Sequence, residues 1–135
     1  MQEQEVARKL ELCVGSFKKV LYEPDDIFLK NMEKNNLAGD DISKYQLWEW
    51  TQGVGLYGLC KLFERTKDGR YLATLREYYD ARIADGLPGK NINTMAPVLA
   101  LSYLYEYTGD ETYGAVCKEW AQWVMDSLPK TKEGG

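Results

Sequence analysis

Two short segments of the sequence carry side chains whose chemistry suits a sugar. Residues 48–52 supply two indoles and an amide, and residues 90–95 supply an amine, amides, a hydroxyl and a thioether. Flat indole faces stack on the C–H faces of sugar rings, and sugar hydroxyls need paired hydrogen-bond donors and acceptors. Helix N-termini also favour a ligand that bears a carboxylate. The predicted ligand-binding residues are Trp48, Trp50, Gln52, Lys90, Asn93, Thr94 and Met95.

Each of these side chains also has an ordinary structural role. Trp48 and Trp50 could belong to the core, and Asn93 or Thr94 could cap the first N–H groups of a helix. For any one residue the structural role is the better interpretation. Their occurrence together, at equivalent positions of a repeat, is what indicates a binding site.

An internal repeat relates the two segments. Residues 62–68 match residues 104–110 in their Leu, Glu, Thr and Asp positions, with an offset of 42 residues. A fixed offset near 40 residues, combined with helical periodicity, is typical of repeated helical hairpins. The same offset carries residues 50–52 onto 92–94, so we expect both segments at the N-terminal ends of equivalent helices, opening on one end of the molecule.

Hydrophobic periodicity predicts an all-α chain. The expected helices are residues 3–21, 25–35, 51–66, 69–84, 94–107 and 111–128, with a polar loop at 36–43 and no strand. By their apolar content, helices 51–66 and 94–107 should be enclosed by the others. The more charged helices 69–84 and 111–128 should lie outside them.

Polar residues and one proline predict where the helices begin. Asp68 and Asp110 should cap the helices that follow them, and Asp25 or Asp26 should cap the second helix. Pro97 fits only within a first helical turn.

Three glycines, Gly53, Gly55 and Gly58, lie inside the expected helix 51–66. Each costs about 1 kcal/mol relative to alanine in a helix. Two explanations remain open, which are close packing of helices and space for a ligand.

Length and charge restrict the function classes. A chain of 135 residues with a net charge of −4 fits one soluble domain and argues against nucleic acid or an anionic membrane as the main partner. No apolar run approaches the ~20 residues that a membrane helix needs. We expect a cytoplasmic protein, unless a secretion signal has been removed.

The cysteines and the absence of histidine narrow the chemistry further. Cys13, Cys60 and Cys117 lack metal-ligand spacing and are predicted to be reduced core thiols. A chain without histidine has no Ser-His or Cys-His nucleophile, and a transition-metal site is not expected.

Four motifs resemble one family of carbohydrate enzymes. They are WEWTQGVGLYGL at 48–59, TKDGRY at 66–71, GLPGKNINTMAP at 86–97 and LPKTKEGG at 128–135. The sequence is similar here to the unsaturated rhamnogalacturonyl and glucuronyl hydrolases, glycoside hydrolase family 105, which is related to family 88. The resemblance implies an (α/α)6 toroid of six helical hairpins. It also implies hydration of the 4,5 double bond of a terminal unsaturated uronic acid, with an aspartate as general acid and base and no metal or cofactor.

The sequence departs from the family pattern in two ways. Family members are far longer, and the aspartate usually assigned as general acid and base falls beyond residue 135. A second carboxylate of some members aligns with Asn93, whose amide can orient a substrate but cannot exchange a proton. Five aspartates of this chain could replace the missing general acid and base, but all are expected to be solvated; they are Asp40, Asp41, Asp80, Asp85 and Asp126.

We therefore expect residues 1–135 to form a partial domain, roughly the first half of a toroid truncated at its C-terminus, and to be inactive alone. Its expected partner is a pectin- or glycosaminoglycan-derived oligosaccharide with a terminal unsaturated uronate. The alternatives are a non-catalytic helical-repeat module that binds carbohydrate or protein, and a purely structural repeat protein. An incomplete toroid should expose apolar flanks of its inner helices and form homo-oligomers through them.

Overall fold

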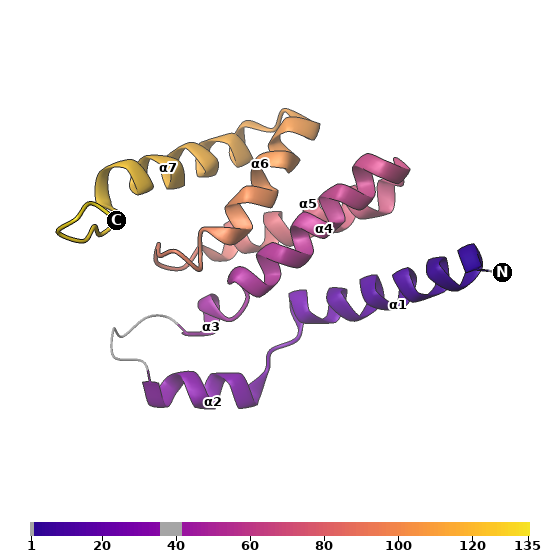
Figure 1. The fold of residues 1–135 in the computed structure, drawn as a ribbon, viewed down its shortest axis with the longest axis horizontal. Coiled ribbons are helices and arrows are strands. Elements are labelled where there is room, and N and C mark those ends of the chain that lie inside the picture. Colours follow the sequence, from indigo (N-terminus) through magenta and orange to yellow (C-terminus); the bar gives the residue numbers. More distant parts are fainter. Residues whose placement is uncertain (1, 36–41) are drawn as a thin grey trace.

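The computed structural model describes residues 2–35 and 42–135, and every regular element in these two ranges is an α-helix. The prediction of an all-α chain is therefore confirmed. The helices are α1 (Gln2–Tyr22), α2 (Asp26–Asn35), α3 (Ile42–Tyr45), α4 (Trp50–Thr66), α5 (Gly69–Asp85), α6 (Ala96–Thr108) and α7 (Glu111–Ser127) (Figure 1).

The six longer helices agree with the predicted boundaries to within two residues. The short α3 was not predicted, because its first two residues lie inside the stretch expected to be a loop and its last two follow directly after it. The Gln46 amide extends this turn by donating to the Ile42 carbonyl at 3.0 Å. In the described ranges no helix combines the length and apolar character needed to cross a bilayer.

Helices α4 and α6 lie side by side and run parallel, although α5 separates them in sequence. Near their N-terminal ends Gly53 lies against the backbone of Ala96. Near their C-terminal ends the Tyr107 hydroxyl donates to Glu64 Oε1 at 2.7 Å. Helix α5 packs on α4 and α7 packs on α6, so that two helical hairpins stand next to each other (Figure 1).

The inner pair of helices is covered on one side only. Val54 of α4 is 63% exposed and Leu99 of α6 is 55% exposed. Conversely, α5 buries Leu75, Tyr78 and Tyr79, although it was expected to be an outer helix. The prediction that α4 and α6 are enclosed is therefore wrong for one face of the pair, which no described element covers.

Trp48 forms the centre of the aromatic core. It has no exposed surface. Its ring stacks on Tyr78 at a centroid distance of 6.1 Å and meets Tyr79 edge-on at 5.7 Å and Trp120 at 6.0 Å. Since these partners belong to α5 and α7, one side chain joins the two hairpins.

The hairpin turns after α4 and α6 have the same hydrogen bonds. The hydroxyls of Thr66 and Thr108 donate to carbonyls four residues earlier, at 2.7 and 2.8 Å. Asp68 and Asp110 accept the amide N–H two residues later, at 2.9 and 3.0 Å, which confirms both as helix caps. The repeat read from the sequence is thus a repeat of backbone geometry.

The two turns differ at the residue with left-handed backbone geometry. Lys67 has φ 56° where the second turn has Gly109 at φ 66°. A side chain in this conformation costs about 1–2 kcal/mol, so Lys67→Gly should raise the free energy of unfolding by about 1 kcal/mol. Urea denaturation measures the change. The reciprocal Gly109→Lys should lower stability by a similar amount; equal stabilities in all three proteins would contradict the assignment.

The glycines of α4 are explained partly by packing. A Cβ on Gly53 would lie 2.6 Å from the carbonyl carbon of Ala96. A Cβ on Gly55 would overlap the ring of Phe17 on α1. Gly58, in contrast, has nothing within 4 Å of its Cβ position. Close approach therefore accounts for two of the three.

Helices α1 and α2 are attached less tightly than the two hairpins. Helix α1 buries only Val14 and Leu21, and α2 buries no residue. On α1, Val6 is 64% exposed and Leu12 is 58% exposed. The amphipathic α1 thus presents much of its apolar surface to solvent.

The cysteines occupy three different environments and none is in a disulfide. Cys60 is buried, and its thiol donates to the Ala100 carbonyl. Burial raises the pKa of Cys60 to about 12 and that of Cys117 to about 11. Cys13 is exposed, so the prediction that it is a core thiol is wrong; it lines an open apolar groove between α1 and α4.

Candidate functional site

The structure brings the two predicted segments together at one end of the molecule. Residues 48–52 span the start of α4, and residues 90–95 directly precede the parallel helix α6. The indole Nε1 of Trp48 donates to the Thr94 carbonyl at 2.8 Å and fixes one segment against the other. We call this end of the helix pair the mouth, and define it by Tyr45, Glu49, Trp50, Asn91 and Asn93.

The two tryptophans of the first segment have opposite environments. Trp48 lies in the core, and its indole N–H is already bonded to protein. Trp50 is 53% exposed and lines a cleft of about 400 Å³ together with Phe28 of α2. Trp50 therefore offers a ring face to a ligand, whereas Trp48 supports the mouth from within.

Gln52 is used by the protein itself. It is 4% exposed. Its Nε2 donates to the Gln46 carbonyl at 2.9 Å, and its Oε1 accepts from the Glu49 amide at 3.1 Å and the Thr51 hydroxyl at 3.0 Å. Glu49 accepts from the Trp50 amide and completes a capping box at the start of α4. The amide of Gln52 thus shapes the mouth and has little capacity left for a ligand.

The turn before α6 is held by Asn91, not by the residues predicted to cap it. Asn91 Oδ1 accepts from the amides of Asn93 and Thr94 at 2.9 and 3.0 Å. The buried Thr94 hydroxyl accepts from the Asn91 amide and donates to the Gly89 carbonyl. The N-cap of α6 is Met95, without a side-chain hydrogen bond, which corrects the prediction of Asn93 or Thr94. Pro97 lies in the first turn, as predicted.

Asn93 is exposed and faces a polar group that sequence reasoning missed. The Tyr45 phenol at the end of α3 lies near Asn93, Glu49 and Asn91 and interacts with all three electrostatically. Burial raises the pKa of Tyr45; the Asn93 contact opposes that rise and the Glu49 contact adds to it. The 42-residue offset places Glu49 and Asn91 at equivalent positions of the repeat, so the sequence could have identified both as candidate residues of the mouth.

Lys90 and Met95 are placed beside the mouth rather than in it. Lys90 Nζ pairs with Glu119 of α7 at 2.7 Å and lies 5.3 Å above the ring centroid of Trp120. Met95 is partly buried against the core. Of the seven predicted residues, Trp50 and Asn93 present side chains to solvent at the mouth, and Gln52 and Thr94 are spent on internal hydrogen bonds. Sugar binding by this set stays a prediction.

The aspartates considered as replacement acids lie away from the mouth. Asp80 accepts from the Tyr113 hydroxyl at 2.5 Å, and Asp126 accepts from Gln122 at 2.8 Å. Asp85 pairs with Arg82 at 2.9 Å. All three aspartates are exposed, and Asp40 and Asp41 lie outside the described residues. None of the five residues that define the mouth is an aspartate, although Asp25 lines the neighbouring cleft at Trp50.

Comparison with known proteins gives a consistent result. The sequence profile described as Glycosyl Hydrolase Family 88 matches residues 25–135. The unsaturated rhamnogalacturonyl hydrolase YesR of Bacillus subtilis (strain 168) is 33% identical over 87 residues, which make up 64% of this chain and 25% of that protein. The chain thus spans about a quarter of the length of this curated relative.

Two solved structures have a similar fold. A possible member of the GH105 family from Klebsiella pneumoniae subsp. pneumoniae MGH 78578 superposes with a TM-score of 0.64 at 33% identity, over 81% of this chain and 33% of that chain. A possible GH105 member from Salmonella enterica subsp. enterica serovar Paratyphi A str. ATCC 9150 gives 0.63 at 42% identity, over 65% and 23%. The two hairpins therefore correspond to part of an (α/α)6 toroid.

Proposed function

This chain belongs to Glycosyl Hydrolase Family 88, and from that premise we propose that it supplies part of the wall of a sugar site in an enzyme that removes terminal 4,5-unsaturated uronic acids. The observation that carries the proposal is that the segments of Trp50 and Asn93 meet at the mouth, where the Trp48 indole of one donates to the Thr94 carbonyl of the other. YesR, an unsaturated rhamnogalacturonyl hydrolase, supports this substrate class.

Three residues of the mouth have proposed roles in binding. The exposed face of Trp50 stacks on a sugar ring. The Asn93 amide donates to and accepts from sugar hydroxyls or a carboxylate, and the Tyr45 phenol lies beside that amide as a further polar group for the ligand. The substrate is an oligosaccharide, of pectin or glycosaminoglycan type, that ends in an unsaturated uronate.

The family resemblance implies an aspartate as proton donor, and the mouth holds none; its one carboxylate, Glu49, accepts from the Trp50 amide in the capping box of α4. Water adds across the double bond: the proton goes to C4 and the hydroxyl to C5, which gives a hemiketal that opens and releases the neighbouring sugar. Asn93 has no proton to exchange at neutral pH. We therefore assign binding to residues 1–135 and place the acid elsewhere in the catalytic domain, in line with the family resemblance.

A titration with a 4,5-unsaturated disaccharide tests the proposal. We expect binding without loss of the double-bond absorbance. Trp50→Ala and Asn93→Ala should each weaken binding by about tenfold, which is the effect of removing one good stacking or hydrogen-bonding contact. Met125→Ala is the matched control, because Met125 is 75% exposed on α7 and is not one of the residues that define the mouth.

The outcomes separate the competing functions. Loss of absorbance would show that residues 1–135 contain their own acid. Affinity that is unchanged in both variants would remove the mouth from the binding site, and an absence of any binding would favour a structural repeat.

We also propose that copies of this chain associate through the uncovered face of α4 and α6. Val54, Tyr57 and Leu99 are all exposed there, and Tyr57 contacts Tyr103 across the two helices at a centroid distance of 5.6 Å. Sedimentation at increasing concentration should show association, and Val54→Lys combined with Leu99→Lys should abolish it. A monomer at every concentration would refute this.

A further inference from the structure

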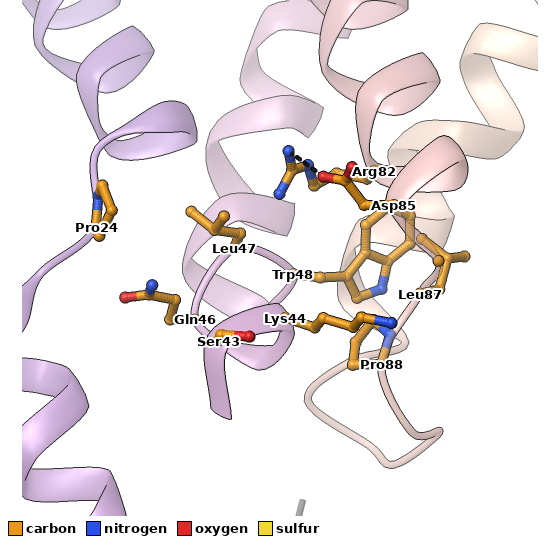
Figure 2. A pocket seen from close by; sticks show the side chains of 11 residues that line it. Pro24, Ser43, Lys44, Gln46, Leu47, Trp48, Arg82, Asp85, Leu87 and Pro88 are labelled. Carbon is orange, nitrogen blue, oxygen red and sulfur yellow. Dashed lines mark ion pairs between the residues drawn. The ribbon is translucent and has the colours of Figure 1, made fainter. Parts of the chain in front are cut away.

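A second cleft opens on the other side of Trp48, between α3 and the C-terminal end of α5 (Figure 2). Its volume is about 480 Å³, within the size range of small-ligand sites. Trp48, Leu47, Leu87 and Pro88 give it apolar walls. A few polar side chains also line it, among them Lys44 and, from the last turn of α5, the largely buried Arg82.

Arg82 is held in an incomplete set of contacts. Its side chain is 17% exposed, and its Nη2 pairs with Asp85 Oδ2 at 2.9 Å. Its Nε is buried and, among the described residues, is the only buried side-chain nitrogen or oxygen without a partner. A buried donor left unpaired costs about 1–3 kcal/mol. Nε and Nη2 form one edge of the guanidinium, and Asp85 uses only half of that edge.

We propose that this cleft binds a small organic carboxylate, with Arg82 as its anchor. When the Arg82 side chain turns its buried Nε towards the cleft, a carboxylate can accept from Nε and Nη2 together in a bidentate pair, which satisfies the unpaired nitrogen. Asp85 is 61% exposed, so its carboxylate can swing into solvent when the ligand arrives. The apolar walls favour an anion with an organic body, such as a uronic acid, over inorganic phosphate.

This site does not rest on the function proposed for the mouth. The mouth lies at Trp50 and Asn93, whereas the Arg82 cleft is reached from the α5 side, and the buried Trp48 lines the latter. The two sites therefore respond to different substitutions.

Nuclear magnetic resonance of the arginine Nε–Hε groups tests the proposal directly. D-glucuronate should shift the Arg82 signal, which Arg82→Lys identifies by removing it, and neutral D-glucose should leave it unchanged. Arg82→Lys keeps the charge but removes the pair of parallel N–H donors. It should therefore weaken the binding measured by calorimetry at least fivefold. Asp85→Asn should tighten it about two- to fivefold, because an exposed ion pair that competes with the ligand contributes about that factor.

Two further variants serve as controls. Arg76→Gln removes another α5 arginine, which pairs with Asp110 away from the cleft, and should leave glucuronate affinity unchanged. Asn93→Ala should leave the response of the Arg82 signal unchanged, which keeps this result separate from that of the mouth. The proposal is overturned if glucuronate fails to shift the Arg82 signal, if Asp85→Asn does not tighten binding, or if phosphate binds as tightly as glucuronate.

Discussion

Trp48→Ala is expected to lower the free energy of unfolding by about 3–5 kcal/mol, the usual cost of deleting a buried tryptophan. The side chain has no exposed surface and contacts Tyr78, Tyr79 and Trp120. Its removal leaves a cavity where the two hairpins meet, and it also leaves the Thr94 carbonyl without its donor. Urea denaturation followed by circular dichroism measures the loss.

Two companion variants separate the contributions. Trp48→Phe keeps most of the volume but removes the indole N–H, so it should cost about 1–3 kcal/mol through the unpaired carbonyl of Thr94. Trp50→Ala, two residues away at a 53% exposed position, should change stability by no more than about 0.5 kcal/mol. Equal losses in the two alanine variants would contradict the assignment of Trp48 to the core and Trp50 to the surface.

Gly53→Ala should destabilise the protein by about 1–3 kcal/mol even though alanine is the better helix former. The new Cβ would meet the backbone of the next hairpin, at 2.6 Å from the Ala96 carbonyl carbon and 2.8 Å from the Pro97 nitrogen. Backbone atoms cannot rotate aside, so α4 and α6 would have to separate. That shift would also displace the turn carrying Asn93, and affinity at the mouth should fall with stability.

Gly58→Ala provides the matched control on the same helix. Nothing lies within 4 Å of its Cβ position, and the residue is exposed. The substitution should therefore raise the free energy of unfolding by up to about 1 kcal/mol, the intrinsic helix preference for alanine. A stabilising Gly53→Ala, measured by the same denaturation experiment, would mean that the two helices are not in close contact.

Local features of the fold were predictable from the sequence, because the groups that decide them are neighbours along the chain. Asp68 and Asp110 cap their helices through amides only two residues away. The start of α6 was not predictable in the same way. Three polar candidates, Asn91, Asn93 and Thr94, lie within four residues there, and the choice of Asn91 depends on the Thr94 hydroxyl being bonded to Gly89.

The candidate site illustrates the same limit. Sequence reasoning treated Trp48 and Trp50 alike, since both flank the start of a helix. Which of them is buried depends on Tyr78 and Trp120, which are distant in sequence. Tyr45 was missed because the residues before it were expected to be a loop, whereas α3 delivers its phenol to the mouth.

The unequal attachment of the helices has a consequence for dynamics. Trp48 joins α5 and α7, so the two hairpins should open as one cooperative unit, with slow amide hydrogen exchange in α4 and α6. Helix α1 buries only two side chains and α2 buries none, so their amide hydrogens should exchange through local opening of lower free energy. The cleft at Trp50 has Phe28 of α2 in its wall, so it lies on the boundary between the two regimes. A sugar bound between the rings of Trp50 and Phe28 would therefore slow amide hydrogen exchange in the loosely held N-terminal helices.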